Sequence, residues 1–182
     1  MDPIVITDAS FNGVGGFAVR LILPNGSEKR VVGPCPETTN TSIAAERFAL
    51  LVGLELALSC GINKNSRLLL LYDCDSIFGP KRPHGRRVHP ATFLPELQAD
   101  VQAWPNLRCV CLPRRHAAIA PCDVQARTFM RSYKRRRLPP PSSMRHALAA
   151  AQPWHPKACQ YMRGMHLESL MNSLGAEVLT KR

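Results

Sequence analysis

The chain has 182 residues, of which 45% are hydrophobic and 20% charged, a composition typical of a globular protein with one good core. It contains no apolar stretch of 18 residues, so the sequence predicts no transmembrane helix. The opening Met1-Asp2-Pro3 lacks the basic and apolar regions of a signal peptide. Seven cysteines without a Cys-x-x-Cys pair favour reduced thiols. We therefore expect an intracellular protein, nuclear or cytoplasmic, that is not secreted and does not bind a membrane.

The net charge of +11 is unevenly distributed. Residues 1–78 carry a net charge of −2, residues 79–130 carry +5, and residues 131–182 carry +8. An acidic first part beside a basic second part predicts a cation-binding centre flanked by a surface for a polyanion. The alternative interpretation is a basic, soluble protein without such a partner.

The first strand predicted is Ile4–Asp8, a continuous apolar run that ends on a carboxylate. Such runs are typical of strands buried on both faces of a sheet. Residues 17–23 and 28–32 are predicted strands joined by the turn Pro24-Asn25-Gly26. The domain is therefore expected to open with an antiparallel meander.

The longest periodic segment, residues 43–60, predicts a helix with Thr41 or Ser42 as its N-cap and Gly61 just after its end. Glu46 is expected in the first turn of this helix. The helix dipole favours a carboxylate there, so this position needs no functional explanation by itself.

A further apolar strand, Arg67–Tyr72, follows this helix. A strand, a helix and a second strand imply a crossover that makes the two strands parallel. Parallel neighbours end at the same edge of a sheet, which is where α/β proteins place their ligands. If the second strand continues to Asp75, we expect Asp75 to meet Asp8 at that edge.

The rest of the chain contains fewer strong signals. Residues 92–104 predict a helix, residues 107–112 a strand and residues 123–133 a helix, followed by the basic and proline-rich segment 134–141. We predict two parts, a domain over residues 1–133 and a basic C-terminal extension over residues 134–182, with helices near 142–151 and 157–174.

Four carboxylates lie where they can meet: Asp8, Glu46, Asp75 and Asp123. Grouped acids repel one another, so the arrangement is reasonable mainly if divalent cations lie between them. Asp73 is a nearby rival to Asp75, and we favour Asp75 because Ser76 follows it.

An ordered set of motifs accompanies these acids. They are Ile6-Thr7-Asp8-Ala9-Ser10, the glycine-rich Gly15–Val19, Thr38–Asn40 with the helical Ala45–Leu50 and Gly53–Ala57, Asp75-Ser76, and Leu112–His116 with Cys122-Asp123. In this order, over about residues 4–133, they resemble the ribonuclease H family, most closely the type-1 domains found free and in retroelement polyproteins.

The resemblance implies an α/β fold with a five-stranded mixed sheet of order 3-2-1-4-5, flanked by helices. It also implies an endonuclease that uses two Mg²⁺ or Mn²⁺ ions to hydrolyse the RNA strand of RNA–DNA hybrids. By the same resemblance, Asp8, Glu46, Asp75 and Asp123 are metal ligands, and His116 takes part in proton transfer or product release.

The resemblance further places Asn12, Gly13 and Asn40 at the nucleic-acid backbone. Charge alone adds the phosphate-contact candidates Arg114 and Arg115 and the basic loop with Lys81, Arg82, Arg86 and Arg87.

The chain departs from the family pattern at Ala9, which replaces a glycine, and in the short segment between His116 and Asp123. Two alternatives therefore stay open. One is a non-catalytic module that binds nucleic acid or a protein partner, with residues 134–182 as the candidate surface for that partner. The other is a related nuclease that acts on DNA. The sequence leaves open whether the chain is a free enzyme or part of a retroelement polyprotein.

Overall fold

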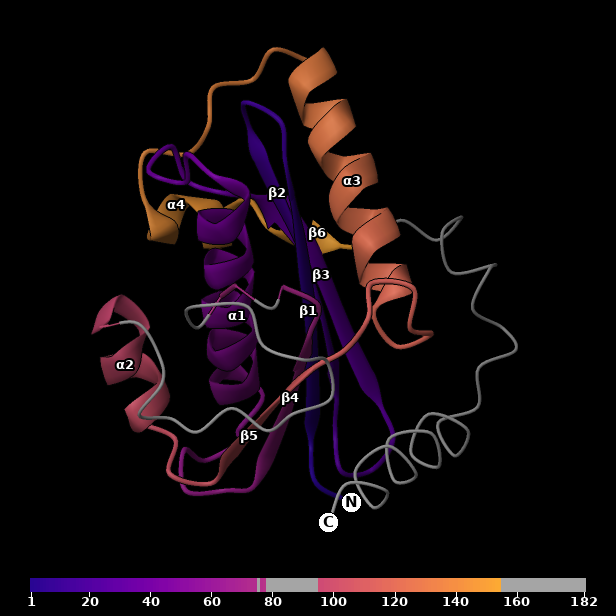
Figure 1. The fold of residues 1–182 in the computed structure, drawn as a ribbon, viewed down its shortest axis with the longest axis vertical. Coiled ribbons are helices and arrows are strands. Elements are labelled where there is room, and N and C mark those ends of the chain that lie inside the picture. Colours follow the sequence, from indigo (N-terminus) through magenta and orange to yellow (C-terminus); the bar gives the residue numbers. More distant parts are fainter. Residues whose placement is uncertain (75, 78–94, 155–182) are drawn as a thin grey trace.

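The computed structural model describes residues 1–74, 76–77 and 95–154 (Figure 1). The strands are β1 (Ile4–Phe11), β2 (Gly15–Ile22), β3 (Glu28–Pro34), β4 (Leu68–Tyr72), β5 (Leu107–Cys111) and β6 (Gln152–Pro153), and the helices are α1 (Ser42–Ser59), α2 (Pro95–Gln102), α3 (Ala120–Arg135) and α4 (Met144–Ala149). The predicted basic loop at residues 81–87 and the predicted helix at 157–174 lie outside the described residues. No helix in the described ranges is long and apolar enough to cross a membrane.

The strands form one mixed sheet of order β5-β4-β1-β2-β3-β6. β1, β2 and β3 make the predicted antiparallel meander, and β4 is parallel to both β1 and β5. The predicted order 3-2-1-4-5 is thus confirmed. The predicted count of five strands was wrong, because β6 adds a sixth strand on the outer side of β3.

Helices cover both faces of this sheet (Figure 1). α1 packs on the face that contains Val5 and Leu70, where Val101 and Trp104 at the end of α2 join the same apolar cluster. α3 packs on the opposite face, over a cluster that includes Ile6 and Leu71. The alternation of side chains along β1 and β4 therefore supplies two cores from the same strands.

A glycine on each face lets a helix and a strand approach closely. A Cβ atom at Gly53 in α1 would lie 2.5 Å from Val5 Cγ1 and 3.0 Å from Thr7 Cγ2. At Gly16 in β2, a Cβ atom would lie 3.0 Å from Ala126 O and from Met130 Cβ in α3. The missing side chains at Gly53 and Gly16 thus let α1 and α3 lie close to the strands that carry the candidate site.

The start of α1 confirms one prediction and corrects another. The side chain of Thr41 caps the helix, accepting a hydrogen bond from Ala44 N at 3.1 Å. Because the helix begins at Ser42, Glu46 lies beyond its first turn, and the expectation that Glu46 lies there was wrong. The helix dipole therefore does not account for Glu46. Gly61, just after the C-cap, has the positive φ of +82° expected at that position.

α3 begins earlier than its sequence pattern indicates. Its first residue is Ala120, and Pro121 is the second. Proline is favoured in the first turn because its missing N–H would be unpaired there anyway. Asp123 consequently lies in the first turn, near the positive end of the helix dipole.

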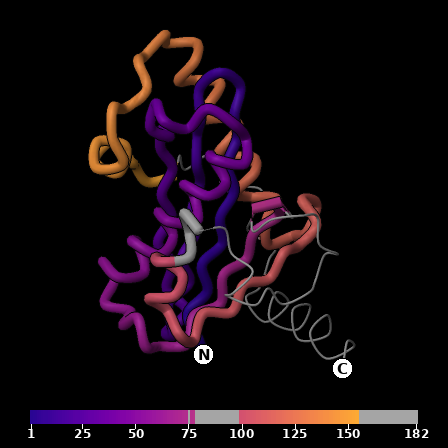
Figure 2. Tube along the Cα trace, turned by 60° about the vertical axis from the view of Figure 1, so that its left-hand side comes forward, coloured from indigo at the N-terminus to yellow at the C-terminus, as the bar shows by residue number. Residues whose placement is uncertain are grey.

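The described part of the extension packs against the sheet. Glu37 N donates to Pro141 O at 2.8 Å, and β6 pairs with β3 through Val31 and Val32. In Figure 2, the orange segment that carries α4 passes beside the purple segment that leads into α1. Residues 138–154 are thus joined to the main sheet along its β3 edge.

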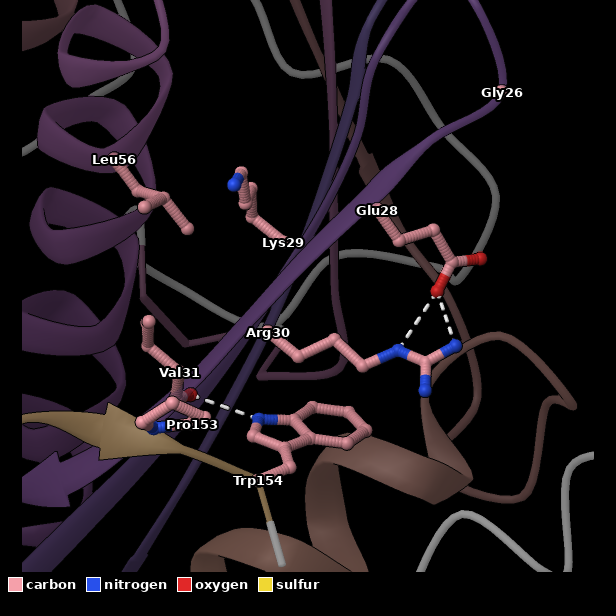
Figure 3. Close-up of a pocket in the computed structure, with 8 residues that line it drawn as sticks. All are labelled: Gly26, Glu28, Lys29, Arg30, Val31, Leu56, Pro153 and Trp154. Carbon is pink, nitrogen blue, oxygen red and sulfur yellow. Dashed lines mark hydrogen bonds and ion pairs between the residues drawn. The ribbon is translucent and has the colours of Figure 1, made fainter. Parts of the chain in front are cut away.

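Trp154 anchors this edge (Figure 3). It is 5% exposed, and its indole Nε1 donates to Val31 O at 2.9 Å. The guanidinium of Arg30 lies over its ring, with Cζ 5.8 Å from the centroid, and is itself ion-paired with Glu28. The indole also lines a pocket of about 630 Å³ on the outer side of β3.

We predict that Trp154→Ala lowers the free energy of unfolding by about 3–5 kcal/mol, because it removes a buried aromatic side chain. Trp154→Phe, which keeps an aromatic ring but not the indole donor, should cost at least about 1 kcal/mol. Urea unfolding followed by circular dichroism measures both. A change below about 0.5 kcal/mol in Trp154→Ala would mean that this anchor contributes no more than an ordinary surface residue.

Candidate metal centre and nucleic-acid interface

Three carboxylates meet at the carboxyl-terminal edge of the two central parallel strands. Asp8 lies in β1, Glu46 in α1, and Asp73 directly after β4. All three are buried, and one oxygen of each lies within 4.8 Å of the others. This separation suits three ligands of one cation.

The register of the sheet explains why Asp8 and Asp73 are neighbours. β1 and β4 pair in parallel, with Ile6 opposite Leu71. Asp8 is two residues beyond Ile6 and Asp73 two residues beyond Leu71, so the two carboxylates are level with each other on the face that α3 covers.

Glu46 reaches the same edge from the opposite face. β4 ends at Tyr72. Beyond that end, the backbone amide of Ala9 in β1 donates a hydrogen bond to Glu46 Oε2 at 3.1 Å. Gly53 lies seven residues further along α1, about two turns, and therefore on the same side of the helix. The close approach at Gly53 thus presses the side of α1 that carries Glu46 against β1.

Burial and mutual repulsion make these acids difficult to ionise. Burial, followed by the nearby Asp73 carboxylate, raises the pKa of Asp8 to about 8. Burial and then the charge of Asp8 hold the pKa of Glu46 well above its usual range. Arg114 opposes both shifts by favouring the charged forms. A bound cation would do the same more strongly.

The oxygen atoms of the trio fit a hard divalent cation. Both carboxylate oxygens of Asp8 and the Oδ1 atom of Asp73 are buried without a hydrogen-bond partner among the described residues. Buried polar atoms are rarely left unpaired, and carboxylate oxygens are the ligands that Mg²⁺ and Mn²⁺ prefer. The unpaired oxygens therefore indicate a place for a cation.

Asp123 lies beside this trio but is held by arginines. It is buried, and its carboxylate forms an ion pair with Arg127 one turn further along α3. Its Oδ1 atom is 3.9 Å from Nε of Arg114, which also donates to Asp73 Oδ2 at 2.8 Å. Arg114 therefore connects the predicted fourth acid to the trio.

The third ligand predicted from the sequence, Asp75, lies outside the described residues. The structure brings its rival Asp73 to Asp8 and Glu46. A signal for Asp73 exists in the sequence: it is the first carboxylate after the apolar run of its strand, as Asp8 is in β1. Asp75, which the following Ser76 favoured, stays a prediction.

The other predicted site residues lie at several places around the sheet. His116, half-buried in the turn before α3, accepts a hydrogen bond from Ala118 N at its Nδ1 atom, 3.1 Å away, which leaves Nε2 to carry the proton of a neutral ring. Asn40 and Arg115 are exposed. Asn12 is exposed between β1 and β2 and accepts from Lys134 Nζ through its backbone and side-chain oxygens, at 3.1 and 3.2 Å. Gly13, with φ +77°, completes that turn.

The solvent-facing side of α3 is basic. Arg127, Arg131, Lys134 and Arg135 are all exposed and project from one side of the helix, which we name the α3 basic face. It begins beside Asp123 and extends toward Asn12, about 18 Å along the helix axis from Asp123 to Arg135. The sequence indicated the charge of this region but not its alignment with the candidate metal centre. The other predicted basic cluster, with Lys81, Arg82, Arg86 and Arg87, lies outside the described residues.

The raised pKa of Asp8 predicts a pH-dependent stability for the metal-free protein. A folded-state pKa of about 8, against the usual 3.8, means that Asp8 imposes no cost on stability below about pH 4 and a growing cost as the pH rises to 8. Asp8→Asn has no charge to bury, so in EDTA its melting temperature should exceed that of the wild type by several degrees at pH 8 and by much less at pH 5.

Thermal unfolding at both pH values, with EDTA or with Mg²⁺, measures this difference. Mg²⁺ should raise the wild-type melting temperature at pH 8 and leave Asp8→Asn almost unchanged. An equal gap between the two proteins at pH 5 and pH 8 would contradict the prediction.

No family model matches the sequence, and no curated protein matches it either. Solved structures do match. LC11-RNase H1, isolated from compost by a metagenomic approach, is 19% identical, with a TM-score of 0.54 over 73% of this chain and 98% of its own. The same protein in complex with an RNA/DNA hybrid gives 20% identity and a TM-score of 0.53, covering 73% of this chain and 99% of that one.

A third solved structure agrees. The N-terminal RNase H domain of a Mycobacterium tuberculosis protein, determined as a fusion with maltose-binding protein, is 18% identical, with a TM-score of 0.50 over 75% of this chain and 99% of that one. Together with the sheet order and the buried acidic trio, these similarities show that the chain has the ribonuclease H fold.

Proposed function

We propose that this protein is a metal-dependent endonuclease that hydrolyses the RNA strand of RNA–DNA hybrids. The observation that carries the proposal is the trio of Asp8, Glu46 and Asp73, with its unpaired buried oxygens, at the edge of a ribonuclease H fold. The neighbour solved with an RNA/DNA hybrid supports the choice of substrate. Ribonuclease H-type hydrolysis of a phosphodiester bond fits this arrangement of ligands.

Each acid has a defined place in the proposed mechanism. Asp8, Glu46 and Asp73 would hold one Mg²⁺ or Mn²⁺ ion, and Asp8 with Asp123 would hold a second. Ions at these positions would lower the pKa of an attacking water and stabilise the leaving 3′ oxygen. The protein itself contributes rigid placement, since the register of β1 and β4 fixes Asp8 relative to Asp73.

His116 is the proposed proton carrier beside this centre. Its Nδ1 atom is engaged by Ala118 N, and this bond orients the ring and leaves Nε2 for a leaving oxygen or a water molecule. The short segment to Asp123 keeps His116 close to the start of α3.

The nucleic-acid path is proposed to follow positive charge. Arg115, the α3 basic face and the turn of Asn12 and Gly13 offer phosphate contacts that do not depend on base sequence. Asn40 and the basic loop with Lys81, Arg82, Arg86 and Arg87 are proposed to add contacts of the same kind.

The central test is cleavage of an end-labelled RNA–DNA hybrid with Mg²⁺, with Mn²⁺ and with EDTA. We expect cutting of the RNA strand in either metal and none in EDTA. Asp8→Asn should reduce the rate by about a thousandfold, because the metal contributes several kcal/mol to transition-state stabilisation. Duplex DNA and single strands, digested in parallel, provide the substrate controls.

Two other outcomes would replace this proposal. Binding of the hybrid without cleavage in any metal would favour a non-catalytic binding module. Preferential cleavage of DNA would favour a related nuclease with the same fold.

A matched pair of variants identifies the third ligand. Asp73→Asn should reduce the cleavage rate as severely as Asp8→Asn, whereas Asp75→Asn should keep the rate within about tenfold of the wild type. The reverse result would support Asp75 as the third ligand, the residue that the sequence favours because Ser76 follows it. Equal loss in both variants would mean that both acids serve the site.

The α3 basic face can be tested through the salt dependence of binding. In EDTA, with Asp8→Asn as the background, Arg131→Ala combined with Arg135→Ala should weaken hybrid binding and reduce the slope of log K against log salt by about 1.8, from about 0.9 for each lost phosphate contact. Lys29→Ala combined with Lys64→Ala removes the same charge from other exposed positions and should leave the slope nearly unchanged. Equal slopes in the two double variants would remove the α3 basic face from the binding surface.

A further inference from the structure

Arg114 lies among the acids of the candidate metal centre. It follows β5 and Leu112, and its side chain is 62% exposed, so it reaches the acids from the solvent side. Its Nε atom is 2.8 Å from Asp73 Oδ2 and 3.9 Å from Asp123 Oδ1. One guanidinium therefore lies between an acid of the trio and the proposed fourth ligand.

The acids themselves stabilise this cation. The hydrogen bond to Asp73 raises the pKa of Arg114, partial burial opposes that shift, and the charges of Asp73, Asp8 and Glu46 reinforce it. Charge-assisted bonds of this type are the stronger hydrogen bonds in proteins. Arg114 is thus bound by electrostatic attraction of the kind that would bind a divalent ion.

The contacts divide the acidic oxygens into two groups. Both oxygens of Asp8 and Oδ1 of Asp73 are unpaired among the described residues. By contrast, Oδ2 of Asp73 accepts from Arg114, and Asp123 is paired with Arg127 and lies near Arg114. One cation position is therefore open, and the position beside Asp123 already has positive charge next to it.

We propose that Arg114 competes with the second divalent ion, so that the protein binds one ion tightly at the trio and a second only when Arg114 leaves Asp73 and Asp123. This inference rests on the proposed function and concerns the regulation of that site. The exposure of Arg114 makes its departure feasible, because a long exposed side chain can turn into solvent without disturbing the core. The competition lowers the apparent affinity for the second ion in proportion to the time that Arg114 spends between the acids.

The test is a titration of the full chain with MnCl₂ in the absence of nucleic acid, followed by calorimetry and by electron paramagnetic resonance of free Mn²⁺. The wild type should bind one ion tightly and a second weakly. Arg114→Ala should bind the second ion about tenfold or more tightly, with the first site changed less. Arg114→Gln provides a second neutral variant of similar size, and Arg114→Lys keeps a positive charge and should stay nearer to the wild type.

Arg115→Ala is the matched control. It removes the same charge from the adjacent exposed residue, and its proposed phosphate contact has no role without nucleic acid. An equal gain in Arg115→Ala and Arg114→Ala would show a general charge effect and would overturn the proposal.

Asp8→Asn distinguishes failure of the metal centre from failure of the competition by Arg114. If the wild type binds Mn²⁺, Asp8→Asn does not, and both neutral Arg114 variants give the wild-type isotherm, the competition proposal fails while the metal centre stands. If no variant and no wild-type protein binds Mn²⁺, the proposed metal centre fails and the competition proposal fails with it.

Discussion

The parallel pairing of β1 with β4 is the constraint on which the rest of the candidate site depends. Ile6 and Leu71 are the last residues that pair between the two strands. Their pairing sets Asp8 level with Asp73 just beyond this point. A shift of one residue would turn one of the two carboxylates to the opposite face of the sheet. The apolar residues before them, buried on both faces, fix that register, so the core of the protein and the position of its acids are specified by the same contacts.

This arrangement has an electrostatic cost that the fold does not remove. Asp8 and Glu46 are buried beside each other, and their raised pKa values express the cost of charging both. Ala9 N satisfies one oxygen of Glu46, and Arg114 satisfies one oxygen of Asp73. Both oxygens of Asp8 and Oδ1 of Asp73 have no hydrogen-bond partner among the described residues, so a bound cation would offset a cost that the folded chain itself leaves in place.

α3 has two functions in this structure because its two sides differ. Ala126 and Met130 pack against the sheet, where Gly16 permits the close contact, while the α3 basic face is exposed to solvent. The first turn of the same helix holds Asp123 next to Arg114 and Arg127. One helix thus links the core, the proposed fourth ligand and the proposed path of the nucleic acid. At the far edge of the sheet, β6 pairs with Val31 and Val32 of β3, and Trp154 donates to Val31 O, so part of that edge is covered by the chain itself.

Sequence alone determined the local features that depend on neighbouring residues. The apolar runs predicted the central strands, Thr41 and Gly61 marked the limits of α1, and the crossover predicted the parallel pairing that joins Asp8 to the end of β4. These features follow from backbone preferences and hydrophobic periodicity, which act over short distances in the chain.

Tertiary structure decided the features that depend on where strands end and on which groups meet across the fold. The register of β4 brought Asp73 to Asp8 and Glu46, while Asp75 lies outside the described residues and stays a prediction. The helix start at Ser42 removed the dipole explanation for Glu46. The sixth strand and the position of Arg114 between Asp73 and Asp123 join residues that are far apart in sequence. No local pattern encodes such contacts, because they arise only when the packed core fixes the distances between the elements.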